Sequence, residues 1–220
     1  SLKLFSEPLL AIESSCDETS VAVLHGRKVL GLVVNSQVEM HAKWGGVVPE
    51  AAARTHVESI LPCLEEALGQ AKLSLNHVAA IGVTNRPGLI GALSVGVTAA
   101  KALSQLKSIP LIGVHHLEGH LLSPFLSAEP GLPHLSLIVS GGHTELVHVQ
   151  SSGEVRIVAE TVDDAAGEAF DKSARLLGLG YPGGRALSDL AEGGNPRRYA
   201  LPRSLPRDAE KFSFSGLKTA

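Results

Sequence analysis

The pattern of apolar and polar residues over the first 115 positions predicts strands and helices in turn. Alternating or short, continuous apolar runs predict strands, and apolar positions spaced three and four apart predict helices. The expected order is three strands followed by helices that alternate with strands, which is typical of an α/β protein. The predicted strands are 9–14, 20–24, 29–35, 78–84 and 110–115, and the predicted helices are 49–70 and 91–106, with a possible kink at Pro62.

The segment 135–162 repeats the pattern of the segment 9–36. The two segments align without gaps, so that strand falls on strand, turn on turn, and Ser140 on Ser14. Few positions are identical, and two three-stranded segments can be alike by chance, but a helical pattern follows each copy, as an internal repeat requires. We therefore predict duplicated α/β lobes at 1–129 and 130–220 with a central cleft.

His116 and His120 lie four residues apart in a segment that is expected to be helical. Side chains at this spacing share a helix face, so both imidazoles can bind one metal ion. The chain has 10 histidines in 220 residues, so two histidines without a shared role are the alternative. Glu118 is two positions from His116, about 200° around the helix, which disfavours the His-Glu-x-x-His site of a zinc protease.

Glycines and hydroxyl groups occupy the turn after the first strand of the second predicted lobe. At Ser140, Gly141 and Gly142, backbone N–H groups can approach a phosphate or carboxylate closely. A plain glycine turn is the alternative. The equivalent turn at 14–19 is polar and acidic, and it suits ligand hydroxyls or a simple hairpin turn equally well.

The glycine pattern GLGYPG at 178–183 matches a dinucleotide-binding motif, but it follows a predicted helix at 165–177 instead of a strand. We therefore reject a Rossmann site here. We expect Gly178 or Gly180 to end that helix, and the segment 182–184 to begin the next one.

Two other segments carry candidate binding groups. The loop 84–91 lacks the Gly-Lys-Ser/Thr ending of a P-loop, but an anion can bind at such a strand-to-helix loop. Asp164, Glu168 and Asp171 recur at helical spacing and can face a ribose, with a solvated helix face as the alternative.

Composition indicates a cytoplasmic protein. The chain is 44% hydrophobic and has no apolar run near the length of a membrane span. Two cysteines in unrelated contexts exclude a disulfide framework, and a net charge of -3 gives no general sign of nucleic-acid binding. The local exception is a basic segment, which suits a solvated loop or a phosphate-binding edge: Arg197, Arg198, Arg203 and Arg207, with Lys211 and Lys218 beyond.

Eight motifs in order resemble the bacterial TsaD (Gcp) proteins, which are relatives of the archaeal and eukaryotic Kae proteins. They are SSCDET, GGVVPE, PGLIGAL, HHLEGH, IVSGGHTEL, AGEAFDK, YPGG and FSFSGLKT. The resemblance implies the actin/Hsp70/sugar-kinase-like fold (ASKHA, RNase H-like). It also implies an acyltransferase that moves a threonylcarbamoyl group from threonylcarbamoyl-adenylate to the exocyclic amine of the adenosine 3′ of the anticodon, in tRNAs reading ANN codons, and releases AMP.

The resemblance also assigns residues and partners. His116 and His120 would be two of three protein ligands to one iron or zinc ion per subunit. The implied partners are tRNA, a TsaB-like paralogue, a TsaE-like ATPase and a TsaC-type adenylate-forming enzyme. The residues implied to bind the substrate are Ile138, Val139, Ser140, Gly141 and Gly142, with Asp171 and Gly184 at its nucleotide part.

The chain also departs from the usual family pattern. Arg86 stands where the family usually has Gly, and Ser188 where many members have an acid. The family continues well beyond position 220, through an Asn that contacts substrate and an Asp that completes the metal site. We therefore expect this chain alone to be a poor catalyst.

Two other functions stay open from the sequence. A non-catalytic TsaB-like scaffold would share the fold, but the histidine pair and SGGHTE argue against it. A small-molecule kinase would use ATP directly and would not require the metal pair.

Overall fold

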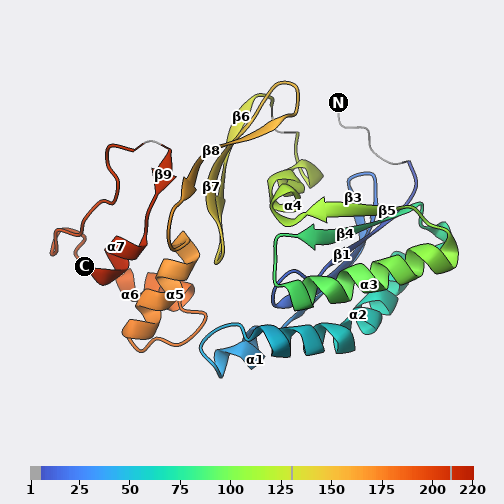
Figure 1. Ribbon diagram of the computed structural model, residues 1–220, viewed down its shortest axis with the longest axis horizontal. Coiled ribbons are helices and arrows are strands. Elements are labelled where there is room, and N and C mark those ends of the chain that lie inside the picture. Colours follow the sequence, from blue (N-terminus) through green and yellow to red (C-terminus); the bar gives the residue numbers. More distant parts are fainter. Residues whose placement is uncertain (1–5, 130, 209) are drawn as a thin grey trace. The chain divides into compact units, whose positions relative to one another are not determined.

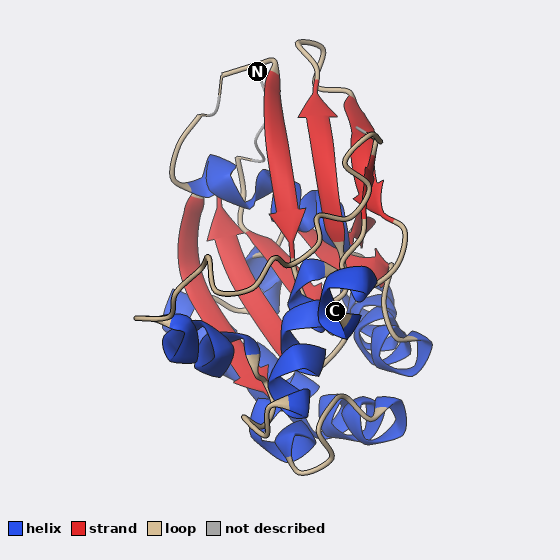
Figure 2. Ribbon diagram, turned by 90° about the vertical axis from the view of Figure 1, so that its left-hand side faces the viewer, coloured by secondary structure: helices blue, strands red, loops and turns tan. Residues whose placement is uncertain are grey.

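The computed structural model describes residues 6–129, 131–208 and 210–220. The chain divides into two compact units, Ser1–Glu129 and Pro130–Ala220. Each unit combines a β-sheet with helices (Figure 2). Within the described residues, no helix is long and apolar enough to cross a membrane.

The first unit is built on a five-stranded sheet in the order β3-β2-β1-β4-β5 (Figure 1). β1, β4 and β5 run parallel, whereas β2 and β3 form an antiparallel meander with β1. Parallel neighbours end at the same edge of a sheet, so the carboxyl ends of β1, β4 and β5 lie together. The strands are β1 Leu9–Glu13, β2 Glu18–His25, β3 Lys28–Ser36, β4 Ala80–Arg86 and β5 Leu111–His115.

Two long helices, α2 and α3, pack against this sheet and against each other. α2 begins at Pro49, which suits a first helical position because its missing N–H has no partner to lose. Pro62 lies inside α2, and the helix continues through it. The helices are α1 Val38–Ala42, α2 Pro49–Ala71, α3 Ile90–Lys107 and α4 His116–Leu122, with 3₁₀ turns at Leu75–His77 and Ser123–Leu126.

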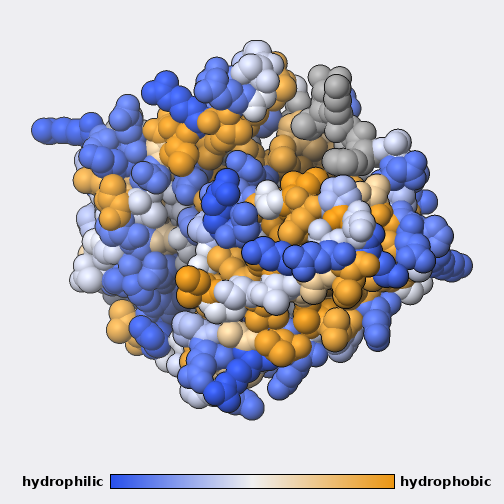
Figure 3. Space-filling model, turned by 45° about the vertical axis from the view of Figure 1, so that its right-hand side comes forward, coloured by the Kyte–Doolittle hydropathy of each residue, from blue (hydrophilic) through white to orange (hydrophobic). Residues whose placement is uncertain are grey.

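The hydrophobic core of the first unit lies between the sheet and these two helices. Leu10, Val21 and Ile81 are fully buried on the sheet, and Leu64 and Ala100 meet them from α2 and α3. Other apolar side chains remain at the surface among polar ones, as one face of the molecule shows (Figure 3). Truncating a buried leucine of this kind to alanine costs about 2–5 kcal/mol.

The second unit has a four-stranded sheet in the order β6-β7-β8-β9. β6, β7 and β8 form an antiparallel meander, and the short β9 runs parallel to β8. The strands are β6 His134–Val139, β7 Thr144–Val149, β8 Val155–Thr161 and β9 Lys211–Phe212, and the helices are α5 Ala166–Leu176, α6 Gly184–Ala191 and α7 Ser215–Thr219.

The meander of the second unit corresponds to that of the first, because β6, β7 and β8 occupy the positions that the repeat predicts from β1, β2 and β3. The units differ in the strand that is added next. β4 pairs with β1 in the first unit, whereas β9 pairs with β8 in the second. Among the described residues, β6 therefore has no strand on its outer edge.

Candidate functional site

Polar side chains gather in the first unit where its three parallel strands end. Glu13 is the last residue of β1, Thr84 lies near the end of β4, and His116 directly follows β5. Ligands of α/β sheets bind outside the carboxyl ends of parallel strands. Buried Leu117 and Leu121 anchor α4, which leaves His116 partly exposed.

The two histidines of α4 converge. Their Nε2 atoms lie 3.1 Å apart, and the rings meet edge to face with centroids 4.6 Å apart. Two imidazole ligands of one tetrahedral zinc ion, each about 2.0–2.1 Å from the metal, place their nitrogens about 3.3 Å apart. The pair therefore fits two positions around one metal ion. No group of three metal-ligating side chains occurs in the part of the chain that the structure describes.

Glu13 is held by several donors at once. Its Oε1 accepts from the backbone N–H of Ser15 at 2.5 Å, and its Oε2 lies 2.6 Å from the donating hydroxyl of Thr84 and 3.1 Å from Nδ1 of His116. Burial raises the pKa of Glu13, but these hydrogen bonds outweigh burial and lower the pKa to about 2. The carboxylate is therefore ionised at neutral pH.

Sequence reasoning did not select Glu13. A signal was present, because a single acidic residue ends an otherwise apolar strand next to a polar turn. What the sequence does not show is that β1 lies beside β4, which brings Glu13 to a histidine 103 residues away.

In the second unit, the Ser140 turn forms the connection between β6 and β7. The Ser140 hydroxyl accepts from the backbone N–H of His143 at 3.0 Å and of Gly142 at 3.3 Å, which shapes the turn. Gly141 and Gly142 are exposed, and no atom lies within 4 Å of a Cβ built on either of them. Of the two residues before the turn, Ile138 is half-buried and Val139 is 55% exposed.

Asp171 of α5 binds the beginning of α6. Its Oδ1 accepts from the backbone N–H of Gly183 at 2.8 Å and of Gly184 at 3.3 Å, so it satisfies donors that the helix leaves unpaired. Gly183 packs directly on α5, because a Cβ there would lie 2.1 Å from the Cβ of Ala174. Gly178, which follows the end of α5, has a φ of 73°, as expected for a glycine that ends a helix.

One face of α5 contacts both the Ser140 turn and the start of α6. The Gly167 N–H donates to the carbonyl of Ser140 at 3.2 Å, and a Cβ on Gly167 would lie 2.6 Å from that oxygen. Gly167 and Asp171 are four residues apart and so lie on the same face, about 6 Å along the helix. The structure thus brings the Ser140 turn and Gly184, the first residue of α6, to the face of α5 that carries Asp171.

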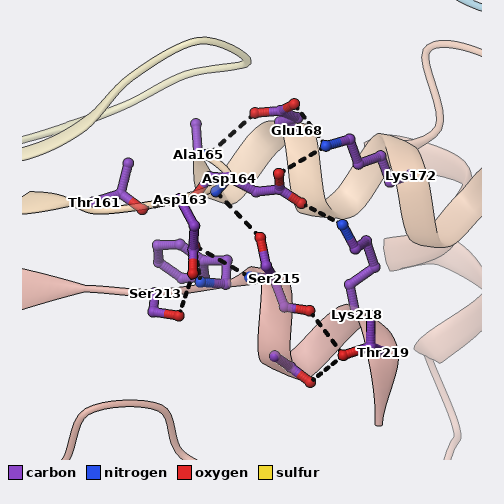
Figure 4. A network of polar contacts seen from close by, with 12 residues as sticks. Thr161, Asp163, Asp164, Ala165, Glu168, Lys172, Ser213, Ser215, Lys218 and Thr219 are labelled. Atoms are coloured by element: carbon purple, nitrogen blue, oxygen red, sulfur yellow. Dashed lines mark hydrogen bonds and ion pairs between the residues drawn. The ribbon is translucent and has the colours of Figure 1, made fainter.

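The other two acids of the predicted ribose-facing set have different partners (Figure 4). Asp164 binds Lys172 at 2.7 Å and Lys218 at 2.8 Å, and Glu168 binds Lys172 at 2.8 Å. Hydrogen bonds and ion pairs with the two lysines lower the pKa of Asp164 to about 2. These carboxylates hold lysines, which leaves Asp171 as the candidate of the three for a ligand.

Asp163 completes this polar network. Its Oδ1 accepts from the backbone N–H of Phe214 and Ser215, and its Oδ2 from the hydroxyl of Ser213 (Figure 4). The motif FSFSGLKT is thereby tied to the turn between β8 and α5. Lys218 has a structural partner, and Lys211 pairs with Asp208 at 3.2 Å, so the predicted basic segment is reduced to its arginines.

Two solved structures share the fold at low sequence identity. Component A of the (R)-2-hydroxyglutaryl-CoA dehydratase of Acidaminococcus fermentans matches with a TM-score of 0.51 and 14% identity, over 97% of this chain and 65% of that one. A ROK hexokinase from Thermus thermophilus matches with a TM-score of 0.50 and 16% identity, over 86% of this chain and 70% of that one. The predicted α/β fold of the actin/Hsp70/sugar-kinase class is confirmed.

Closer relatives are found by sequence. Proteins named tRNA N6-adenosine threonylcarbamoyltransferase from Syntrophotalea carbinolica and Trichlorobacter lovleyi are 53% and 56% identical to this chain over 214 residues. Each match covers 96% of this chain and 63% of the relative, so the chain spans about 63% of the length of these curated relatives. A family model described as TsaD, tRNA N6-adenosine threonylcarbamoyltransferase, matches residues 28–220. On this match and these identities, the chain belongs to the TsaD family.

Proposed function

We propose that this protein transfers a threonylcarbamoyl group from threonylcarbamoyl-adenylate to the exocyclic amine of the adenosine 3′ of the anticodon, in tRNAs that read ANN codons. Family membership supports this reaction, because the relatives are named for it. In the reaction the amine nitrogen forms a bond to the carbamoyl carbon, the bond from that carbon to the phosphate oxygen breaks, and AMP leaves. The amine gives up one proton.

The observation that carries the proposal is the convergence of His116 and His120, with Nε2 atoms 3.1 Å apart. A TsaB-like scaffold has no need of such a pair. We assign the pair to one iron or zinc ion per subunit, and imidazole nitrogen suits either metal. The bound ion would supply Lewis-acid polarisation of a carbonyl oxygen. The pair accounts for two ligands, and the family resemblance assigns a third to an Asp that lies beyond position 220 in the family.

The nucleotide part of the substrate is assigned to the second unit. The exposed turn Ser140-Gly141-Gly142 offers backbone N–H groups to phosphate or carboxylate oxygens. Asp171 of α5 contacts the N-terminus of α6 at Gly184, and its carboxylate can accept from a ribose hydroxyl there. Ile138 and Val139 lead into the turn at the end of β6.

The tRNA is assigned to the arginines that follow α6. Arg198 lies over the ring of Tyr199 at 5.5 Å, an arrangement that also suits an unstacked base. Guanidinium groups bind phosphate oxygens in pairs, and such binding weakens as salt rises. The four arginines, all exposed, are Arg197, Arg198, Arg203 and Arg207.

A TsaB-like paralogue is the proposed protein partner for which the first unit offers a surface. Val57 and Leu61 lie one turn apart on α2 and are 62% and 60% exposed. Exposed apolar surface can mark a protein contact where it is contiguous, and we assign this face of α2 to the partner. The TsaE-like ATPase and the TsaC-type enzyme, which would supply the adenylate, are proposed from the family resemblance alone.

The test is a transfer assay with the purified chain, its TsaB-like paralogue, threonylcarbamoyl-adenylate and a tRNA that reads ANN codons. Modified adenosine is measured by mass spectrometry of the digested tRNA. We expect His116→Ala and His120→Ala to lower the rate by about 100-fold or more, as expected when transition-state stabilisation is removed. His77→Ala, an exposed histidine of the same unit, is the matched control and should leave the rate unchanged.

A slow wild-type rate agrees with the poor catalysis expected of this chain, whereas a rate no higher than that of the same mixture without the chain would contradict the proposed transfer. Equal rates for wild type and both histidine variants would contradict the role of the pair. A small-molecule kinase would instead consume ATP without tRNA, which the same mixture reveals if ADP is measured after ATP is added.

A further inference from the structure

The environment of His116 determines which of its ring nitrogens carries the proton. Nδ1 lies 3.1 Å from Glu13 Oε2 and 3.2 Å from the hydroxyl oxygen of Ser15. The Glu13 carboxylate already accepts from the Ser15 backbone N–H at Oε1 and from the Thr84 hydroxyl at Oε2, so it faces Nδ1 as a hydrogen-bond acceptor. This geometry directs an Nδ1–H group to Glu13, and in that tautomer the lone pair lies on Nε2.

The remaining contacts of Glu13 keep the carboxylate in place. The Ser15 backbone N–H holds Oε1, and the Thr84 hydroxyl holds Oε2. Both donors belong to buried residues, with exposures of 4% and 6%, and neither is on α4. The carboxylate is thus fixed by β1, β4 and the turn after β1, independently of the helix that carries the histidines.

The orientation that results is the one a metal ligand needs. With Nδ1 directed to Glu13, the Nε2 atom of His116 points to the Nε2 atom of His120, 3.1 Å away. Metal-bound histidines commonly donate their other N–H to a carboxylate, which fixes the tautomer and makes the ligand more basic.

We propose that Glu13 is the positioning residue of this site, holding His116 in the Nδ1–H tautomer with Nε2 turned towards the position that His120 also faces. The inference rests on the proposed function of the histidine pair. Glu13 acts through His116 and is assigned no contact with the metal or the substrate.

The experiment uses the full 220-residue chain, with Zn²⁺ as a diamagnetic probe. Zinc affinity is measured by competition with a chromophoric chelator, and the tautomer of His116 by the ¹⁵N chemical shifts of its ring in the metal-free protein. We expect the wild type to show protonated Nδ1 and unprotonated Nε2. Glu13→Ala should give a mixture of tautomers and an affinity about 10–100-fold lower, the usual effect of removing an outer-shell partner.

Two further variants separate positioning from general structural damage. Glu13→Gln retains an oxygen acceptor, so it should restore the tautomer and most of the affinity. Thr19→Val removes a buried hydroxyl that lies 2.7 Å from Nδ1 of His56, so it takes a hydrogen bond from a different histidine. It should lower the thermal midpoint and leave zinc affinity unchanged.

The outcomes are distinct. Wild-type affinity and a single tautomer in Glu13→Ala would overturn the inference while the metal pair stands, and so would an equal loss of affinity in Thr19→Val. If wild type and His116→Ala bind zinc equally weakly, the metal site itself is wrong and the inference fails with it.

Discussion

The carboxylate of Asp164 accepts a hydrogen bond from the ammonium group of Lys218 at 2.8 Å, although the two residues are 54 positions apart. Asp164 follows β8, and Lys218 belongs to the last helix, α7. The pair therefore ties the C-terminal segment of the second unit to its sheet.

Acid should weaken this connection. The pKa of Asp164 in the folded protein is about 2, below its ordinary value of 3.8, so the carboxylate adds stability at pH values above 3.8. That contribution is lost as the pH falls from about 4 towards 2. We expect Asp164→Asn to be less stable than wild type at pH 6 and to lose less stability over this window, measured by urea unfolding at each pH.

The control for this prediction is Asp189→Asn. Asp189 pairs with Arg185 on the exposed face of α6, and exposed pairs contribute little to stability. An equal change in the pH dependence of both variants would contradict the special role of Asp164.

A second prediction concerns the contact between α5 and the Ser140 turn. A Cβ on Gly167 would lie 2.6 Å from the carbonyl oxygen of Ser140, so Gly167→Ala must displace backbone. We expect it to destabilise the protein by about 1–3 kcal/mol. Gly141→Ala has open space around it and should change stability by less than about 0.5 kcal/mol. The midpoints of thermal unfolding of the two variants test this prediction. Equal midpoints would rule out the close contact between Gly167 and the carbonyl of Ser140.

A third prediction concerns nucleotide binding by the second unit. If Asp171 and the Ser140 turn contact the adenylate, Asp171→Ala should weaken AMP binding in calorimetry by about tenfold, equivalent to one lost hydrogen bond to a charged group. Gly141→Val should also weaken it, because the valine side chain would occupy the open space through which the ligand approaches the turn. Asp171→Ala should also cost about 0.5–2 kcal/mol of stability, because α6 loses its cap. AMP affinity that neither variant changes would contradict the proposed placement.

Local patterns predicted most of the regular elements. The apolar run that predicts 9–14 gives β1 at Leu9–Glu13, and the helical spacing at 91–106 gives α3 at Ile90–Lys107. The gapless repeat places β7 at Thr144–Val149. Each of these elements buries one face against a core. Apolar residues therefore recur along the sequence with the spacing of a strand or of a helix.

Short elements were missed because they depend on distant partners. β9, Lys211–Phe212, has two residues and exists through its pairing with β8, and α7 begins where Asp163 accepts its first N–H groups. The candidate site likewise has one contact that local spacing predicts and one that it does not. The convergence of His116 and His120 follows from helical spacing, whereas the contact of Glu13 with His116 depends on the order of strands in the sheet.

The last prediction concerns the open face of β6. Leu135, Leu137 and Val139 alternate along this strand and are 55–62% exposed. Within the described residues no strand pairs with the outer edge of β6, and an apolar strand at an open edge promotes association. We expect the double variant Leu135→Thr/Leu137→Thr to self-associate less than wild type in sedimentation velocity, with nearly unchanged stability because little buried area is lost.

Val147→Thr is the matched control for these substitutions, since Val147 lies on the neighbouring strand β7 and is only 2% exposed. A hydroxyl placed there loses contact with water, so this variant should be destabilised by about 1–3 kcal/mol. It should not reduce self-association, because the face of β6 is unchanged. If the double variant associates as strongly as wild type, the apolar face of β6 is not the contact surface. If it unfolds as readily as Val147→Thr, the two leucines are buried in solution.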